Sequence, residues 1–442
     1  MSIALLTDRY ELTMLQAALL DGTAERHCVF EVFARRLPPG RRYGVVAGTG
    51  RLLELLGELD WNHPDGTMDY LLNAGVINRE TASWLAGHRF SGTIRGYAEG
   101  ECYFPGSPVL TVEGTFAECV LLETLILSVL NHDCAVASAA SRMTTAAGSR
   151  PCLEMGARRT HEQAAVAAAR AAFVGGFAGT SVLEAGRLWD VPTIGTAAHA
   201  FTLLHDSEEA AFISQVGSMS NQTTLLVDTY SVTQAVRTAI EVGGKDLAAV
   251  RIDSGDLTQL AGEVRALLDE LGAVGTKIVV TSDLDEYAIA ALAVAPVDSY
   301  GVGTRLVTGS GAPTAEMVYK LVAREGPGGE LEPVAKTAGG PKSTNGGAKR
   351  AGRRLDATGR AEEELVVARS HKFPADQKIR PLQQTFVEAG AINQTWTGAG
   401  GLRRAAHHHK TSLAELPRHA TRLSDGEPAI PTVRASAQEI GT

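Results

Sequence analysis

The chain of 442 residues lacks several patterns that would assign it quickly to a common functional class. Its five cysteines contain no CxxC pair and have no spacing typical of a zinc site, so we expect reduced thiols. No GxxxxGK[ST] sequence occurs, which means that a bound nucleotide would have to be held without a P-loop. A net charge of −9, with no basic block before the C-terminal tail, argues against a nucleic-acid partner.

Neither the N-terminus nor the most apolar segment indicates export or insertion into a membrane. The first residues, MSIALLTDRYELTM, have no basic region, no long apolar stretch and no small-residue cleavage site. The most apolar segment, FAECVLLETLILSVLNH at 116–132, is interrupted by Glu118 and Glu123 and is shorter than the ~20 residues that a span requires. We therefore expect a buried helix there, no membrane partner, and a cytoplasmic protein.

Three short apolar runs between residues 224 and 305 end in polar residues or glycine: AAVRIDSGD, KIVVTSD and SYGVGT. Continuous apolar runs are typical of buried parallel strands, and ligands of α/β folds bind beyond the carboxyl ends of such strands. The residues at these ends are Arg251, Asp253, Asp256, Asp283, Gly301, Gly303 and Thr304. Carboxylates suit a divalent cation, a Gly-x-Gly turn lets backbone N–H groups approach a phosphate, and arginine binds planar anions. The pattern predicts a site for a phosphate-bearing, metal-bound substrate.

Some of these residues also have simpler structural explanations. Asp256 precedes the amphipathic helix LTQLAGEVRALLDELG and is expected to cap it, with Gly272 ending the helix. Arg251 and Asp253 are two positions apart at a strand end and can point into one site, although a structural ion pair would also explain Arg251. His199, after PTIGTAA, is either a nucleophile or base aimed into the site from a strand end, or a histidine hydrogen-bonded near the start of a helix.

Helix and strand signals divide the chain into three regions. Residues 1–115 combine helices with β-like segments and predict a β-rich α+β domain. From 116 to 325 the signals alternate in about seven βα units, which predicts an irregular TIM-like (β/α) barrel that carries the active site. Residues 326–442 are expected to be loop-rich, above all at 326–360, and to complete the α+β part. The adjacent histidines 407–409 cannot all face one metal ion, and nothing near them in the sequence completes a site.

Several longer motifs, taken in order, carry a family resemblance. TDRYELTMLQAAL, FPGSPVLTVEG, EMGARRTH, GTAAHAF, RIDSGDL and YGVGTRLVT resemble nicotinate phosphoribosyltransferase, over most of residues 3–325. The resemblance implies a type II phosphoribosyltransferase that joins nicotinate to phosphoribosyl pyrophosphate, giving nicotinate mononucleotide and pyrophosphate in NAD salvage. It also implies ATP as a co-substrate, Mg²⁺ as a cofactor and a homodimer with shared active sites. Nicotinamide and quinolinate phosphoribosyltransferases share this architecture, so acid or amide preference has to be measured.

The resemblance implies roles for individual residues around the reacting groups. His199 falls on the histidine that ATP phosphorylates, in the motif GTAAHAF. Asp253 matches a carboxylate near the ribose and the magnesium ion, which it binds directly or through water. Thr196, Arg251 and Tyr10 match contacts to nicotinate, with Tyr10 reaching into the site of the neighbouring subunit.

Other positions are implied in phosphate and substrate binding. Gly301, Gly303 and Thr304 match the phosphate-binding turn of the family, and Asp283 joins the substrate-binding set. Arg142, in SAASRM, resembles a phosphate-contacting arginine of the related nicotinamide enzyme.

Two other functions stay open at this point. A barrel enzyme acting on a phosphorylated sugar, such as an aldolase, would need a catalytic lysine at a strand end, and the sequence places none there. A catalytically silent homologue that senses NAD precursors is disfavoured by the presence of His199, Arg251 and Asp253.

Overall fold

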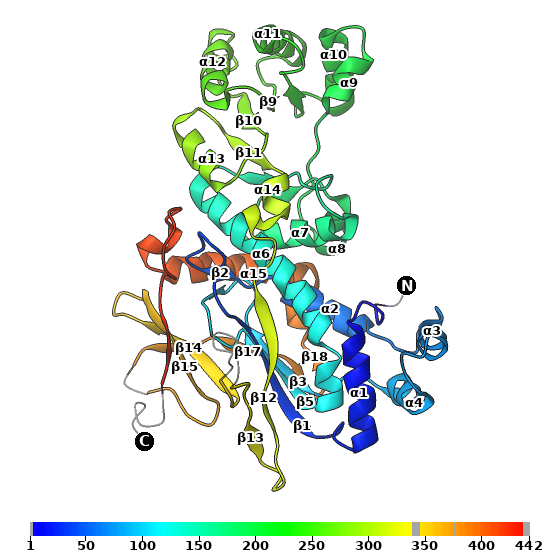
Figure 1. The fold of residues 1–442 in the computed structure, drawn as a ribbon. Helices are drawn as coiled ribbons and strands as arrows, with labels where there is room; N and C mark the ends of the chain where they lie inside the picture. Colours follow the sequence, from blue (N-terminus) through cyan, green and yellow to red (C-terminus); the bar gives the residue numbers. More distant parts are fainter. Residues whose placement is uncertain (1–2, 338–344, 375–376, 436–442) are drawn as a thin grey trace. The chain divides into compact units, whose positions relative to one another are not determined.

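The computed structural model describes residues 3–337, 345–374 and 377–435 and divides into two compact units (Figure 1). The first unit combines Met1–Ser138 with Ala312–Thr442, so the blue-to-cyan and the yellow-to-red parts of Figure 1 belong to one unit. The second unit is Ala139–Gly311. One division point lies inside helix α6 (Glu123–Ala147), whereas the sequence placed the domain boundaries at 115/116 and 325/326.

The first unit is built around an antiparallel sheet of seven strands. In spatial order they are β13 (Leu331–Pro333), β12 (Met317–Glu325), β1 (His27–Ala34), β5 (Leu110–Thr115), β3 (Thr93–Tyr97), β17 (Gln383–Glu388) and β18 (Ala391–Ile392). Strand β1, HCVFEVFA, carries the β-branched and aromatic residues that favour extended structure and is buried at nearly every position. The C-terminal region thus supplies β13, β17 and β18 to a sheet that the N-terminal residues begin.

Smaller sheets and the helices complete the described part of this unit. The four-stranded sheet has the order β16 (Ile379–Pro381), β14 (Lys349–Leu355), β15 (Ala361–Ala368) and β19 (Thr432–Arg434), and β2 (Gly44–Val45) pairs with β4 (Cys102–Tyr103). The helices are α1 (Arg9–Asp21), α2 (Thr49–Glu58), α3 (Thr67–Asn73), α4 (Arg79–Gly87), α5 (Phe116–Val120) and α15 (Gly398–Glu415). Within the predicted loop region 326–360 the structure has β13 and β14, while residues 338–344 lie outside the described residues.

A buried ionic network joins the C-terminal strands and helix of the first unit to its N-terminal half. The Arg353 side chain is completely buried and donates to Glu101 at 2.7 Å, to Glu364 at 2.6 Å and to the backbone oxygen of Cys102 at 2.6 Å. Arg380 donates to the other oxygen of Glu101 at 2.8 Å. Buried charges persist only when they are paired in this way, so these contacts fix how the segments pack.

The three adjacent histidines lie on α15 and face different surroundings. His407 is exposed, and Nε2 of His408 lies 2.8 Å from Glu101. His409 is buried, its Nδ1 lies 3.2 Å from the Gly100 oxygen, and burial lowers its pKa to about 4. No group of three or more potential metal ligands forms here or elsewhere among the described residues.

The second unit contains six parallel strands in one sheet. Their order is β7 (Gly179–Thr180), β6 (Cys152–Glu154), β11 (Ser299–Val302), β10 (Lys277–Val280), β9 (Ala249–Ile252) and β8 (Thr224–Leu226). The helices are α7 (Glu162–Val174), α8 (Leu183–Trp189), α9 (His199–Leu204), α10 (Glu208–Met219), α11 (Val232–Gly243), α12 (Leu257–Glu270), α13 (Glu286–Ala291) and α14 (Thr304–Val307). Because the strands are parallel, their carboxyl ends meet at one edge of the sheet.

The predicted TIM-like barrel is only partly present. Within residues 139–311 the strands β7 and β8 remain at the two edges, so the sheet is a half barrel and closure is not confirmed. The segment PTIGTAAH, predicted as a strand, contributes an isolated bridge between Thr180 and Thr193. Pro192 and Gly195 flank that bridge, and both residue types disfavour a continuous ladder.

One helical segment in the described part of the chain, residues 116–147, is long and apolar enough to cross a membrane by length and composition. It comprises α5 and α6, and 61% of its most apolar window is buried inside the protein. The core helix of a globular protein passes the same test, and the burial agrees with the buried helix predicted for 116–132.

We expect Glu101→Gln to destabilise the first unit by roughly 3–5 kcal/mol at pH 7, because the amide leaves the buried Arg353 charge poorly compensated. Burial alone would raise the pKa of Glu101, but Arg353, His408 and Arg380 lower it well below its ordinary value of 4.5. The carboxylate therefore stabilises the fold above about pH 4.5, and this contribution is lost as the pH falls.

Urea denaturation at pH 7 and at pH 4 measures this effect. The difference between the native protein and Glu101→Gln should shrink at the lower pH, while Glu362→Gln, at a half-exposed ion pair, should change little at either pH. A difference that is the same at both pH values would contradict the role assigned to the ionised carboxylate.

Candidate active site

A polar cavity of about 250 Å³ lies at the carboxyl ends of β6, β9, β10 and β11 in the second unit. Its lining residues are Met155, Arg158, Arg159, Arg251, Asp253, Thr281, Ser282, Asp283, Gly301, Gly303 and Thr304. All the strand-end residues predicted from the sequence line it except Asp256. That carboxylate caps α12 as predicted, accepting hydrogen bonds from the backbone N–H groups of Thr258 and Gln259, each at 3.1 Å.

Arg251 presents part of its guanidinium group to this cavity. One terminal nitrogen donates to the Thr196 hydroxyl at 2.7 Å, which brings the two predicted nicotinate contacts together. The Nε–H group is buried and has no hydrogen-bond partner among the described residues. Burial lowers the pKa of Arg251, and the carboxylates of Asp253 and Asp228 offset part of that lowering. The Nε–H group can therefore serve an anionic ligand.

Two further arginines, to which the sequence reasoning gave no role, line the cavity. Arg158 and Arg159 follow β6 within the motif EMGARRTH, and the positive charge of Arg158 lies near enough to Arg251 to lower its pKa. Three guanidinium groups thus face two carboxylates, Asp253 and Asp283, which suits a ligand with several negative charges. The same strand-end rule that selected Asp253 would have found them, but the strand before them is only three residues long.

Asp228 connects His199 to the end of β9. The Asp228 side chain is 2% exposed, and its Oδ2 accepts hydrogen bonds from the Asp253 backbone N–H at 2.9 Å and the Ser254 hydroxyl at 2.6 Å. Its Oδ1 lies 3.9 Å from Nε2 of His199 and has no hydrogen-bond partner in the described part of the chain. On the other side of the ring, Nδ1 of His199 lies 3.1 Å from the Thr229 hydroxyl. The imidazole is therefore held between two consecutive residues that follow β8.

His199 itself is the first residue of α9 and does not stand at a strand tip. The strand-tip alternative from the sequence was therefore wrong in its local structure, because PTIGT does not form a strand. His199 is not a lining residue of the cavity. Glu208, at the start of α10, adds a second carboxylate near Asp228, since burial and the Asp228 charge both raise its pKa.

Arg142 and Tyr10 lie elsewhere. Arg142 is 4% exposed, pairs with Glu286 at 3.0 Å, donates to the Tyr287 hydroxyl at 3.4 Å, and does not line the cavity. Tyr10 belongs to α1 of the first unit and is 41% exposed. Burial raises the pKa of its hydroxyl, and the carboxylate of Glu123 adds to the rise. The phosphate contact of Arg142 and the intersubunit contact of Tyr10 stay predictions.

The two glycines of the GVGT turn differ in the space that a side chain would have. A Cβ atom on Gly301 would lie 2.4 Å from Cγ2 of Thr281 and 2.7 Å from the sulfur of Met155, so glycine is required there for packing. The Thr281 hydroxyl in turn donates to Oδ1 of Asp253. A Cβ atom on Gly303 would have its nearest contact at 3.3 Å, with the backbone oxygen of Met155. Gly301 is therefore needed for the packing of Thr281 and Met155 beside the cavity. Gly303 leaves its backbone accessible to a ligand.

Ser282, another lining residue that the sequence did not reveal, has φ of 133°, a conformation that residues with a side chain rarely adopt. Such strain costs on the order of 1–3 kcal/mol and gathers at functional sites. It places Ser282 and Asp283 at the cavity directly after β10.

A parallel α/β sheet whose strand ends carry an arginine-rich cavity, with a histidine held by a buried aspartate, defines an enzyme that acts on phosphorylated substrates. The nicotinate phosphoribosyltransferase (NAPRTase) N-terminal domain matches residues 5–131, and the nicotinate phosphoribosyltransferase (NAPRTase) family matches residues 151–337. The chain belongs to the nicotinate phosphoribosyltransferase family.

Individual relatives agree with this assignment. Over 436 residues the chain is 55% identical to nicotinate phosphoribosyltransferase pncB1 of Mycobacterium tuberculosis (strain CDC 1551 / Oshkosh), covering 97% of this chain and 94% of the relative. It is 34% identical over 386 residues to nicotinate phosphoribosyltransferase of Bacillus subtilis (strain 168), covering 85% and 78%. The crystal structure of human nicotinic acid phosphoribosyltransferase has the same fold, with a TM-score of 0.82, 24% identity and 98% coverage of both chains.

We expect Gly301→Ala to lower both stability and activity. The added methyl group pushes against Thr281 and Met155, which should cost about 1–3 kcal/mol and displace the hydroxyl that orients Asp253. A displacement near the reacting groups should lower kcat/KM by roughly tenfold or more. Gly262→Ala, in an open position on α12, is the matched control and should not lower either quantity. Full activity of Gly301→Ala would contradict the packing argument.

Proposed function

We propose that this protein transfers the phosphoribosyl group of phosphoribosyl pyrophosphate to nicotinate in NAD salvage, coupled to ATP hydrolysis through His199. The observation that carries the proposal is the Asp228 carboxylate, which lies beside His199 and also accepts the backbone N–H of Asp253. A change of charge at the imidazole can thus reach the substrate cavity through one buried side chain. Membership of the family and the names of its relatives support nicotinate and phosphoribosyl pyrophosphate as substrates.

In the transfer step, the ring nitrogen of nicotinate forms a bond to C1 of the ribose while the bond from C1 to pyrophosphate breaks. The transition state carries positive charge on the sugar, which the Asp253 carboxylate, oriented by the Thr281 hydroxyl, can offset. Arg158 and Arg159 suit the phosphate groups, and the free Nε–H of Arg251 suits the carboxylate of nicotinate. Holding both substrates in one cavity supplies a large part of the rate.

The residues present fit a magnesium ion that arrives with the substrate. Asp253 and Asp283 supply carboxylates beside the arginines, and Mg²⁺ in such sites is held by one or two carboxylates together with substrate phosphates. When bound, Mg²⁺ neutralises negative charge on the pyrophosphate leaving group.

In the coupling step, a bond forms between an imidazole nitrogen of His199 and the γ-phosphorus of ATP while the bond from that phosphorus to ADP breaks. Asp228 faces Nε2 and favours a proton on that nitrogen, which leaves the lone pair of Nδ1, beside Thr229, for the attack. Hydrolysis of the phosphohistidine later releases phosphate. While the phosphoryl group is attached to His199, its negative charge changes the surroundings of Asp228 and, through Asp228, those of the Asp253 backbone.

The direct test is an assay of the purified protein with phosphoribosyl pyrophosphate, Mg²⁺ and either nicotinate or nicotinamide, with and without ATP. We expect nicotinate mononucleotide and pyrophosphate as products, with ATP hydrolysis that depends on both substrates. Conversion of nicotinamide alone would overturn the proposed substrate, and transfer that ATP does not affect would overturn the coupling.

Arg251→Lys should raise KM for nicotinate and lower kcat/KM by a factor corresponding to about 1–3 kcal/mol. A lysine ammonium keeps the charge but cannot reproduce the planar guanidinium that binds Thr196 and leaves Nε–H for the ligand. Steady-state kinetics and thermal melting of the same preparation separate recognition from folding. A folded variant with unchanged KM for nicotinate would remove Arg251 from the binding site.

His199→Asn should abolish ATP hydrolysis and the acid-labile, base-stable phosphoryl label while leaving slow transfer without ATP. Asparagine has no nitrogen lone pair for the attack, whereas the cavity residues and the magnesium site remain. Radiolabelling and intact-mass measurement test this, with His205→Asn as the matched control that keeps the label. Nδ1 of His205 lies 2.8 Å from the Phe201 backbone oxygen, so it already has a structural partner. A label that persists in His199→Asn would move the phosphorylation to another histidine.

We also propose a homodimer in which Tyr10 completes the site of the neighbouring subunit, supported by its partly exposed position on α1. Tyr10→Ala and His199→Ala, each nearly inactive alone, should then regain partial activity when mixed under conditions that exchange subunits. One of the two sites in each heterodimer would be intact. Subunit exchange is verified by mass spectrometry. If no activity returns after exchange, Tyr10 belongs to its own subunit's site or has a structural role.

A further inference from the structure

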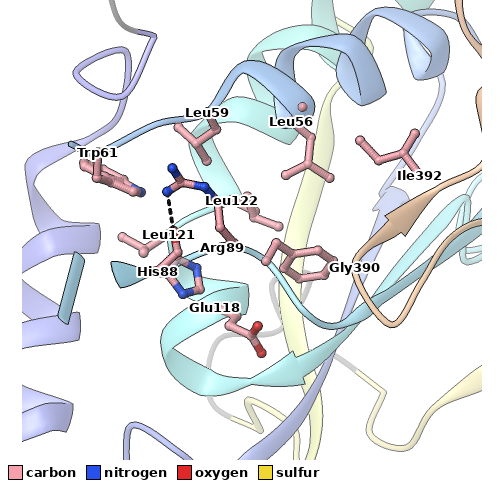
Figure 2. A pocket seen from close by; sticks show the side chains of 12 residues that line it. Leu56, Leu59, Trp61, His88, Arg89, Glu118, Leu121, Leu122, Gly390 and Ile392 are labelled. Atoms are coloured by element: carbon pink, nitrogen blue, oxygen red, sulfur yellow. Dashed lines mark hydrogen bonds between the residues drawn. The ribbon is translucent and has the colours of Figure 1, made fainter. Parts of the chain in front are cut away.

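A second cavity, of about 170 Å³, is formed entirely by residues of the first unit (Figure 2). Four segments that are distant in the sequence line it: the end of α2 and the residues after it, the residues after α4, α5 and the residues after it, and the turn that contains Gly390 with Ile392 of β18. Five of the lining residues are aliphatic: Leu56, Leu59, Leu121, Leu122 and Ile392. None of these residues has a role in the function proposed above.

The indole of Trp61 lies at one end of the group of side chains in Figure 2 and supplies a hydrogen-bond donor. Trp61 is 1% exposed, and its Nε1–H group has no hydrogen-bond partner among the described residues. A buried donor without a partner is rare in folded proteins and is costly to maintain. An acceptor atom inside the cavity would remove that cost, so the cavity suits a ligand that brings one.

The charged groups of the cavity make an anionic ligand unfavourable. Arg89 donates to the His88 backbone oxygen at 2.8 Å and to Asp60 at 3.1 Å, so its charge is already paired. Glu118 accepts four hydrogen bonds, from the backbone N–H and hydroxyl groups of Ser91 and Thr115. Although burial would raise the pKa of Glu118, these hydrogen bonds lower it. Arg89 and Glu118 are the charged lining residues and cancel each other, and Asp60, which lies outside the lining, pairs with Arg89. The cavity therefore offers no uncompensated positive charge to an anion.

His88 does not change this balance. Burial lowers its pKa below the ordinary value of 6.5, so the ring is neutral at pH 7, and it stacks on Trp84 with a centroid distance of 4.3 Å. A cationic ligand would also find little to bind, because the Glu118 oxygens are saturated with donors and Asp60 accepts from Arg89. The lining thus favours a neutral molecule with an apolar body and one acceptor.

We propose that this cavity binds a neutral, single-ring aromatic molecule that carries a carbonyl oxygen, such as an aromatic carboxamide, with that oxygen accepting from Nε1–H of Trp61. The size agrees, because an apolar cavity of about 150 Å³ accepts benzene. The aliphatic side chains would enclose the ring. The site is distinct in sequence from every residue assigned to phosphoribosyl transfer, so it can be tested independently of that function.

Benzamide and benzoate, which have the same shape and differ in charge, are the matched probes. The indole ¹⁵N–H signals of the full-length protein are followed by NMR during titration, and the signal missing from Trp61→Phe identifies Trp61. We expect benzamide to shift the Trp61 signal in a saturable manner, and benzoate to bind at least about tenfold more weakly. Leu56→Phe should fill the cavity and abolish the shift, while Leu55→Phe, one position away on α2 and outside the lining, should retain it.

Three results would overturn the proposal. The first is a Trp61 signal that benzamide does not move in the folded protein, and the second is equal affinity for benzoate. The third is a cross-peak between the Trp61 N–H and water that persists at saturating benzamide, which would show that an internal water is the partner of this group.

Discussion

The buried carboxylate of Asp228 is the contact on which the arrangement of the active site depends. It holds the backbone at the end of β9 through Asp253 and Ser254 and faces the His199 ring. Because the side chain is almost fully enclosed, losing it would leave these donors unpaired, at a cost on the order of 1–3 kcal/mol for each group. One side chain therefore contacts both the backbone of Asp253, which lines the candidate active site, and the ring of His199.

Much of the cavity could be predicted from the sequence because parallel strands impose a simple rule. Buried strands read as continuous apolar runs, and the residues that follow them meet at one edge, so Arg251, Asp253 and Asp283 could be grouped without coordinates. The same local reasoning located α12 and its cap at Asp256. These features depend on residues close together in the chain, where periodicity and capping are informative.

Other features depend on contacts that the sequence does not display. Asp228 and the pair Arg158 and Arg159 follow strands of only three residues, and none of the three was selected as a site residue from the sequence. Arg353 lies in a segment rich in Gly, Lys and Arg that was interpreted as loop, yet Glu101, some 250 positions earlier, pairs with it in the core. Composition reports average exposure, and a buried ion pair is an exception that only the tertiary structure reveals. Barrel closure is not confirmed for a similar reason, since counting strands does not show which edges pair.

The seven-stranded sheet of the first unit has a consequence for how the chain is made. Strand β1 pairs on one side with β5, nearby in the sequence, and on the other with β12, where Cys28 lies opposite Arg324. At typical rates of synthesis, roughly 15 to 60 seconds separate the appearance of these two residues. The whole second unit, residues 139–311, is produced in that interval. During translation, one edge of β1 therefore stays unpaired until β12 has left the ribosome.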